Sequence, residues 1–276
     1  MVSENRDISS LWHAINNLTK KSNCKPLNCS WSPDSLNNHF IHVAENVGLT
    51  NTSQSAGEYC PSSTLIDFCK DRMKPNSSFK IPFIGIHEVG SFISKIKSKK
   101  SLGPDKISSS LLKLALPYLV EPLTFIYNKC IEQSIVPPIL KTAKVVPIPK
   151  CKDLSDLNNF RPISILTVLS KPLEKHIHKH LMKYLESNCL LHPLQSGFRH
   201  HHSYQTAIVR LCDEWLTAIN QRKMTGAIFL DFKKAFDLVN HNILLTKLKL
   251  YLRDDKTVSF SRPTLRIEHN MSVMPV

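Results

Sequence analysis

Residues 227–237 read Ala-Ile-Phe-Leu-Asp-Phe-Lys-Lys-Ala-Phe-Asp, and this stretch decides how the rest of the chain is interpreted. A short apolar run opened by Gly226 ends in one carboxylate, Asp231, before a basic and aromatic turn. Ile and Phe in so short a run predict a buried β-strand. A carboxylate held at the end of a rigid strand is placed to bind a metal ion. The structural alternative is that Asp231 only caps the next helix.

Charge is the strongest compositional signal. The 276 residues include 36 Lys and Arg against 22 Asp and Glu, a net charge of +14. Residues 80–179 hold 16 basic and 7 acidic side chains, so +9 of the excess (16 minus 7) lies in one block. The hydrophobic content of 42% supports a folded core. A basic block beside apolar segments favours a polyanionic partner, usually nucleic acid. From charge alone, a solvated basic surface is an equally good explanation.

Cysteine and histidine spacing indicates no metal site. The eight cysteines lack the close two-residue spacing of a zinc knuckle, which predicts buried free thiols in a reducing compartment. His176 and His180 would share a helix face at a spacing that zinc also uses. Because no companion carboxylate motif or cysteine pair accompanies them, we interpret them as part of a solvated helix face.

Targeting signals are also missing from the sequence. No apolar run approaches the length of a membrane span, and residues 1–7 lack the layout of a signal peptide. We therefore expect an intracellular protein, in the cytoplasm or the nucleus, with no membrane partner.

The chain divides into three regions. Residues 1–80 are polar and predict a connector or N-terminal extension that is poorly ordered in part, with helices near 8–18 and 36–46. Residues 81–255 predict one helix-rich α+β domain, with helices over 86–96, 110–127, 172–185, 203–220 and 242–251. Two prolines within 144–150 forbid a helix there and indicate an extended strand. The pattern decays over 256–276, which we interpret as a tail.

Two basic side chains are candidates for binding phosphate. Arg161 stands before a stiffening proline, and a guanidinium pairs bidentately with phosphate oxygens. A hairpin would bring Lys150 close to Arg161, and Lys144 could add charge toward template or nucleotide. Phe236 follows Asp231 by five residues. Its ring could pack beneath a nucleotide sugar and exclude a 2′-hydroxyl, or it could be an ordinary core residue.

Five motifs stand in an informative order: Gly103–Ile107, Val146–Lys150, Asn159–Ser164, Gln195–Arg199 and Phe229–His241. Their order resembles that of reverse transcriptases of non-LTR retrotransposons (LINE elements), particularly the jockey-like group. The resemblance runs from Ile81 to Leu250. It implies an incomplete right-hand polymerase, with helix-rich fingers and a partial palm, that copies RNA into DNA with Mg²⁺. The implied partners are an RNA template, a DNA primer and dNTP.

The resemblance also implies residue roles. Asp231 would be the first catalytic, metal-binding aspartate, with the Phe232 backbone carbonyl beside it. The implied nucleotide-binding residues are Lys150, Arg161 and Phe236. The implied template-binding residues are Lys144, Gly103, Pro104, Asp105 and Arg199.

Departures from the family pattern limit the expected activity. Lys106 replaces a usual glycine, and Cys151 and Lys152 replace a usual Pro-Gly. The later Pro-Gln-Gly and aromatic-x-Asp-Asp motifs, which supply the other catalytic carboxylates, do not occur. Asp254 and Asp255 imitate the second motif but follow Asp231 too soon, so we interpret them as a solvated helix end. We therefore expect a piece of reverse transcriptase truncated after its first aspartate motif and inactive alone. The alternative is a non-catalytic module that binds RNA or an RNA–DNA hybrid.

Overall fold

The computed structural model describes residues 31–42, 61–73, 77–98, 101–232, 235–236 and 238–265. The described part is helix-rich, with one two-stranded sheet, which confirms the α+β prediction. Its elements are α2 (Pro33–Ile41), α4 (Ser63–Arg72), α5 (Ile86–Ser94), α6 (Ser109–Leu114), α7 (Leu116–Gln133), α8 (Pro138–Lys141), β1 (Ala143–Pro149), η1 (Leu157–Asn159), β2 (Phe160–Leu166), α9 (Ser170–Ser187), α10 (Tyr204–Asn220), α11 (His241–Leu252) and α12 (Asp255–Leu265). The predicted helix near 8–18 lies outside these residues.

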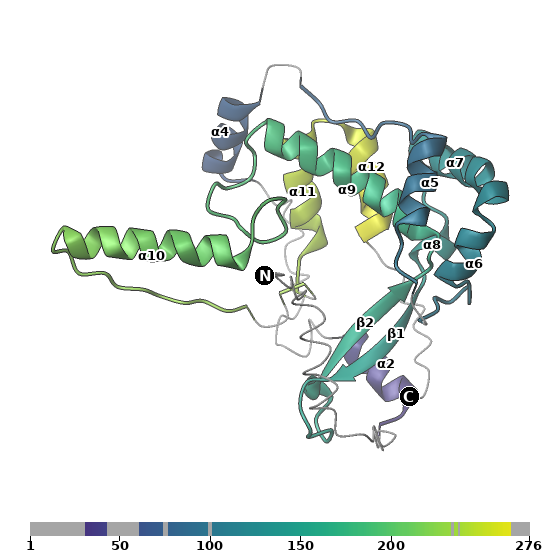
Figure 1. The fold of residues 1–276 in the computed structure, drawn as a ribbon, viewed down its shortest axis with the longest axis horizontal. Coiled ribbons are helices and arrows are strands. Elements are labelled where there is room, and N and C mark those ends of the chain that lie inside the picture. The colour runs from purple at the N-terminus through teal and green to yellow at the C-terminus, as the bar shows by residue number, and fades with distance from the viewer. Residues whose placement is uncertain are drawn as a thin grey trace, which may run out of the picture.

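A helical body forms the centre of the molecule, and two parts project from it (Figure 1). The β1–β2 hairpin extends from one side with α2 against it, while α10 extends as a long arm from the other. Within the described ranges, none of the helices is both long enough and apolar enough to cross a membrane.

The main core joins α5, α6, α7, α9 and α12. Val89 and Ile93 lie one turn apart on α5, and both are completely buried. They pack in one cluster with Leu112, Tyr127 and residues of α9 and α12. Full burial of an aliphatic side chain contributes about 1.5–3 kcal/mol, so this stripe fixes how α5 sits on its neighbours. The helices predicted from apolar periodicity over 86–96 and 172–185 are confirmed, whereas the one predicted over 110–127 is divided at Ala115 into α6 and α7.

An extended segment, residues 77–85, runs between these helices. Asn128 on α7 accepts a hydrogen bond from the Ile84 backbone N–H (2.8 Å) and donates one to the Ile84 carbonyl (3.0 Å). Further along, the Phe79 N–H donates to the Leu252 carbonyl (2.8 Å), and the Thr257 hydroxyl donates to the Phe79 carbonyl (3.2 Å). A buried backbone without such partners is strongly destabilised. The segment is therefore held by polar side chains and backbone from several helices.

Side-chain packing continues across residues 80 and 255, the boundaries at which the sequence pattern changes. Leu36 and Phe40 of α2 pack on Val145 and Phe160 of the hairpin. The expected tail is helical as far as Leu265, with Phe260 in the main core. The helix predicted near 36–46 is present as α2, whereas α12 was not predicted, because a short apolar pattern is a weak signal.

The strand predicted to end at Asp231 is not formed. Residues 223–232 are extended but lie in neither strand of the sheet, and the side chains of Ile228, Phe229 and Leu230 are 89%, 80% and 83% exposed. The prediction of a buried strand is wrong for this structure. A strand of this kind is buried by pairing with neighbours, and the described residues provide no strand to pair with it.

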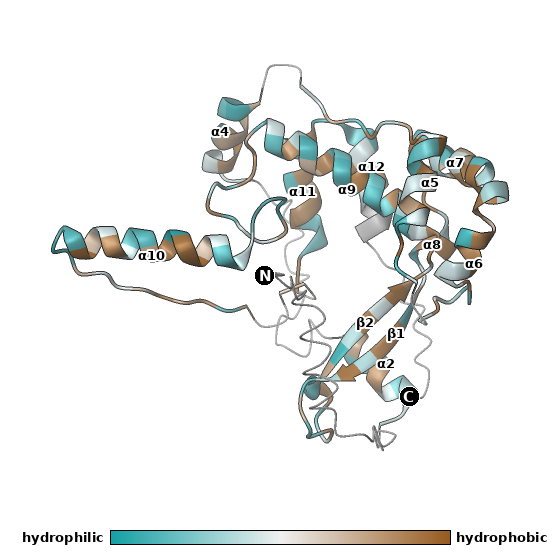
Figure 2. Cartoon of the chain, in the orientation of Figure 1, coloured by the Kyte–Doolittle hydropathy of each residue, from teal (hydrophilic) through white to brown (hydrophobic). Residues whose placement is uncertain are grey.

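Helix α10 shares this exposure. The predicted helix is confirmed and begins with a capping box between Ser203 and Thr206, yet none of its residues is buried. Apolar residues recur along α10 and the segment after it (Figure 2), and Ile208, Val209 and Leu216 of this helix are exposed. The prediction of buried thiols is correct for only part of the described cysteines. Cys69 and Cys130 are buried, but Cys151, Cys189 and Cys212 are exposed.

We predict that Asn128→Leu lowers the free energy of unfolding by about 3 kcal/mol, because two buried backbone groups of Ile84 lose their partners at about 1–3 kcal/mol each. Urea unfolding followed by circular dichroism measures the loss. The control is Asn220→Leu at the exposed end of α10, which should change stability by less than about 0.5 kcal/mol. Equal effects of the two substitutions would contradict the role given to Asn128.

Candidate nucleic-acid interface

The β1–β2 hairpin brings the predicted phosphate-binding pair together. The strands are antiparallel, with Ile148 opposite Arg161 and Pro149 opposite Phe160. Lys150 continues from β1, and its backbone N–H donates to the Asn159 carbonyl at 2.7 Å. Because side chains alternate along a strand, Lys150 lies on the same face as Ile148 and Arg161. The predicted hairpin is confirmed.

The two faces of the hairpin differ in burial. One face turns Val145 and Phe160, 1% and 4% exposed, onto α2. The other face leaves Ile148 and Ile163 46% and 43% exposed, with the charged side chains Lys144, Lys150 and Arg161 around them. Lys144 lies four residues from Ile148, about 14 Å along the strand. The open face is thus an aliphatic stripe with a cation at one end and two at the other.

Lys150 and Arg161 are both exposed. The Lys150 ammonium donates to the Asn158 carbonyl at 2.6 Å, which holds its side chain at the turn. Asp153 lies in the same turn and accepts hydrogen bonds from the Ser155 hydroxyl and backbone N–H, which lower the pKa of its carboxyl. The turn with Cys151 and Lys152 in place of Pro-Gly is therefore organised by polar side chains.

The Gly103–Asp105 loop is tied to the end of β2. Gly103 is buried, and a Cβ there would lie 2.9 Å from the Leu166 carbonyl and 2.9 Å from the Thr167 Cα. The Asp105 carboxylate accepts from the Ile107 N–H at 3.2 Å. Lys106 has φ 56°, a left-handed conformation that costs a non-glycine residue about 1–2 kcal/mol. Lys106, at a position where the family usually has glycine, thus has the left-handed backbone conformation that favours glycine.

The 195–199 loop meets the turn after Asp231. Phe198 and Phe236 form an edge-to-face pair, with ring centroids 5.9 Å apart and an interplanar angle of 88°. Both rings are largely exposed, at 83% and 77%. Arg199 donates through Nη1 to the carbonyls of His192 (3.2 Å) and Gln195 (3.4 Å). Arg199 therefore stabilises the loop, and the loop contacts the predicted sugar-discriminating residue.

Asp231 is not joined by a set of potential metal ligands among the described residues. Its side chain is exposed, and Asp231 belongs to no cluster of three or more His, Cys, Asp or Glu side chains within the described residues. Asp237 lies outside those residues. Phe232, whose carbonyl was predicted to share the metal, is 78% exposed on the same extended segment. The described residues therefore do not form a two-ion magnesium site, because hard cations held by protein need several oxygen ligands.

Asp254 has a structural role. Its carboxylate accepts hydrogen bonds from the Thr257 backbone N–H (2.8 Å) and hydroxyl (2.6 Å), as a residue capping the start of α12 does. Asp255 is exposed in the first turn of that helix. The interpretation of this pair as a helix end is confirmed, at the start of α12 rather than the end of α11.

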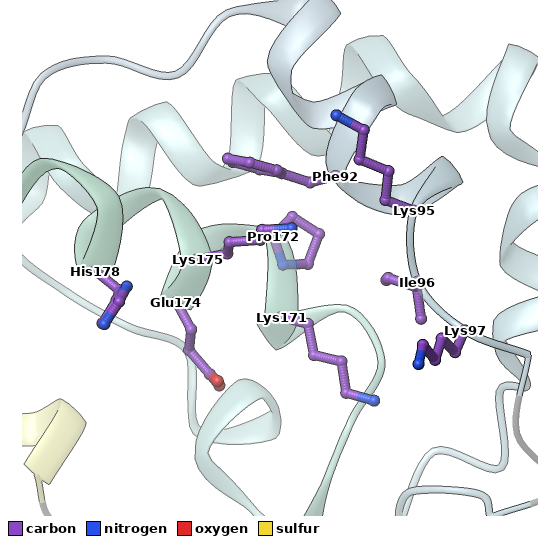
Figure 3. Close-up of a pocket in the computed structure, with 9 residues that line it drawn as sticks. All are labelled: Phe92, Lys95, Ile96, Lys97, Lys171, Pro172, Glu174, Lys175 and His178. Atoms are coloured by element: carbon purple, nitrogen blue, oxygen red, sulfur yellow. The ribbon is translucent and has the colours of Figure 1, made fainter. Parts of the chain in front are cut away.

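A basic groove runs along α9, and the sequence indicated only its charge. One hollow between α5 and α9 is lined by Lys95, Lys97, Lys171 and Lys175, with Phe92 above Lys175 (Figure 3). The Lys175 ammonium lies 5.0 Å from the centre of the Phe92 ring. A second hollow shares Phe92, Lys175 and His178 with the first and continues to Lys183, Arg199 and His200. We call the two hollows together the α9 groove.

The α9 groove has the features of a surface that binds a nucleic-acid backbone. Its lysines recur at 171, 175, 179 and 183, one turn apart, along a helix of 18 residues that spans about 27 Å. Lysine contacts with phosphate oxygens position a nucleic acid without reading its sequence. Arg199, predicted to bind template, lies at one end of the groove.

Comparison with known proteins shows similarity to one family of polymerases. Residues 148–266 match the family model of reverse transcriptase (RNA-dependent DNA polymerase). The chain is 31% identical over 170 residues to the RNA-directed DNA polymerase from the mobile element jockey of Drosophila funebris, covering 61% of this chain and 19% of that protein. It is 32% identical over 173 residues to a probable RNA-directed DNA polymerase from transposon BS of Drosophila melanogaster, covering 62% and 19%.

The chain is therefore similar to reverse transcriptases over residues 148–266. More particularly, it is related to the RNA-directed DNA polymerases of jockey-like and other non-LTR mobile elements, as the sequence motifs predicted. It spans about a fifth of the length of the curated relatives it matches. The match begins within β1 and includes α12, so the helix that was expected to be an unrelated tail lies inside the family region.

We predict that Lys171→Ala with Lys175→Ala weakens binding of single-stranded RNA and lowers the slope of log affinity against log salt by about 1.4, since each lost phosphate contact contributes about 0.7. Fluorescence anisotropy over a series of salt concentrations measures both changes. The control removes the same charge from α7 and α11 by Lys129→Ala with Lys249→Ala, neither of which lines the α9 groove. An equal change of slope in both double variants would show that net charge, not the groove, binds RNA.

Proposed function

We propose that this chain supplies the nucleotide- and template-binding part of an RNA-directed DNA polymerase of a non-LTR mobile element. The observation that carries the proposal is the open hairpin face, where Lys144, Lys150 and Arg161 surround an exposed aliphatic stripe. This face lies where the reverse transcriptase match begins. Its partners would be an RNA template, a DNA primer and dNTP, with Mg²⁺ as the metal.

The proposed roles follow from the chemistry of each side chain. Arg161 and Lys150 contact the triphosphate, because a guanidinium and an ammonium on one face can bind several phosphate oxygens. Phe236 packs against the sugar of the incoming nucleotide. Lys144, the Gly103–Asp105 loop and the loop held by Arg199 contact the template, and the α9 groove follows its backbone.

Polymerisation also needs metal-binding carboxylates. Bound Mg²⁺ ions would activate the primer 3′-hydroxyl and support the leaving pyrophosphate. In this proposal Asp231 is one ligand for them and the Phe232 carbonyl another. These two groups do not complete a site among the described residues, so we infer that a polypeptide of these 276 residues binds its partners without joining nucleotides.

A second candidate function is non-catalytic binding, and the exposed position of Asp231 without further metal ligands among the described residues favours it. If the hairpin does not bind nucleotide, the α9 groove still gives a non-catalytic module for RNA or RNA–DNA hybrid, because backbone contacts and shape suffice for such binding. Nucleotide binding separates the two candidates.

The test uses the full chain, an RNA template annealed to a DNA primer, Mg²⁺ and a fluorescent dNTP matching the template. We expect the dNTP to bind the complex, the affinity to fall at least about tenfold with Arg161→Ala, and primer extension to be undetectable. A bidentate phosphate contact of about 1.5–3 kcal/mol corresponds to that loss. Lys152→Ala, which removes an exposed charge from the same turn, is the control.

Three outcomes decide between the candidates. Loss of dNTP binding with Arg161→Ala but not with Lys152→Ala supports the polymerase role. Binding of the hybrid with no binding of dNTP to the unchanged chain supports the non-catalytic module. Primer extension by the unchanged chain contradicts the inference that Asp231 lacks its partner carboxylates.

A further inference from the structure

Three potential metal ligands converge between α5 and α9, on residues to which the proposed function assigns no role. His176 and His180 lie one turn apart on α9, with ring centroids 4.5 Å apart, and Glu88 reaches them from α5. One ligand atom from each of the three lies within 4.8 Å of the others. The prediction that the histidine pair belongs to a solvated helix face is wrong, because His176 is buried. Glu88 is 88 positions before His176 and could not be recognised in the sequence as its companion.

The hydrogen bond of His176 Nε2 to the Pro82 carbonyl leaves the other ring nitrogen, Nδ1, beside Glu88. His176 is completely buried, and its Nε2 lies 2.8 Å from the Pro82 carbonyl, which can only accept. Nε2 therefore carries a proton, and Nδ1 of the neutral ring has a lone pair. Nδ1 lies 3.2 Å from Glu88 Oε2 but forms no hydrogen bond. Two lone pairs at this distance repel each other unless a cation lies between them.

A proton would satisfy only part of this cluster. Protonation of His176 Nδ1 would give it an ion pair with Glu88, but His180 Nε2 would still be buried without a hydrogen-bond partner in the described structure. Burial lowers the pKa of His180, which favours its neutral, metal-binding form. A divalent ion would accept a lone pair from each of the three side chains.

The second oxygen of Glu88 is already held. Lys179 donates to Glu88 Oε1 at 2.6 Å, which leaves Oε2 toward the histidines. The Pro82 carbonyl fixes the other ring nitrogen of His176 in the same way. Supporting contacts of this kind orient the ligands of metal sites in proteins.

We propose that Glu88, His176 and His180 bind one divalent transition-metal ion of the Zn²⁺ type, joining α5 to α9. Bonds of 2.0–2.1 Å in a tetrahedron place neighbouring ligand atoms about 3.3 Å apart, close to the 3.2 Å between His176 Nδ1 and Glu88 Oε2. Imidazole nitrogens favour zinc and its neighbours over Mg²⁺. Three protein ligands leave a fourth position for water.

The site lies where a bound ion would affect the α9 groove. His176 and His180 lie on the same helix as Lys171 and Lys175, and α5 precedes Lys95 and Lys97. An ion that joins α5 to α9 would therefore fix the distance between the two walls of the α9 groove (Figure 3).

The test is zinc titration of the full chain after removal of metal with a chelator. The parent carries His200→Gln, His201→Gln and His202→Gln, which removes the exposed histidine run. We expect isothermal titration calorimetry to give a tight site of one ion per chain, weakened at least tenfold by His180→Gln. His178→Gln, on the exposed side of α9, should bind as the parent does. Cobalt(II) in the same site should show tetrahedral visible bands without a thiolate charge-transfer band.

A parent chain without a tight site, or equal affinity in the parent and the His180→Gln chain, would overturn the proposal. A thiolate charge-transfer band would also overturn it, because the ion would then be bound by cysteine. If His180→Gln does not fold by circular dichroism, Glu88→Gln decides in its place, since it keeps the size of the side chain and removes the charge. Its affinity must fall at least tenfold for the proposal to stand.

Discussion

The backbone of residues 79–84 is the constraint on which the helical body depends. In the part of the chain that the structure describes, no strand pairs with this segment. Its buried polar groups are satisfied from the surrounding helices by Asn128 at Ile84, His176 at Pro82 and Thr257 at Phe79. Each bond also fixes the element that supplies it. α7, α9 and α12 are thereby placed around one extended chain, and Val89 and Ile93 of α5 complete the core immediately after it.

The same helices present the proposed binding surfaces. Tyr127 in the core donates to the Leu169 carbonyl at 2.7 Å, just before α9 begins. Burial raises the pKa of Tyr127, so its hydroxyl stays protonated and can donate. The inner side of α9 is therefore anchored, while its lysines face the groove. The hairpin is anchored in a comparable way, because one face packs on α2 and the other remains open for Lys150 and Arg161.

How much the sequence predicted depended on whether a feature was local. The amphipathic helices, the β1–β2 hairpin and each of the motifs behind the family resemblance depend on residues close in sequence. The strand at Asp231 was predicted wrongly, because an apolar run specifies a strand only when partner strands are present. Glu88 beside His176, and the joining of two hollows along α9, come from tertiary packing and had no sequence signal.

Our central claim is that the binding surfaces on the hairpin and α9 are formed while the Asp231 segment is unpaired. Hydrogen-exchange mass spectrometry of the full chain, free and bound to an RNA template–DNA primer duplex, tests it most directly. Amides without hydrogen bonds exchange freely, whereas paired or covered amides are protected. We expect added protection in residues 143–166 and 170–187 on binding, and rapid exchange of residues 224–232 in both states. Protection of residues 224–232 in the free chain, or unchanged exchange in the hairpin and α9 on binding, would contradict the claim.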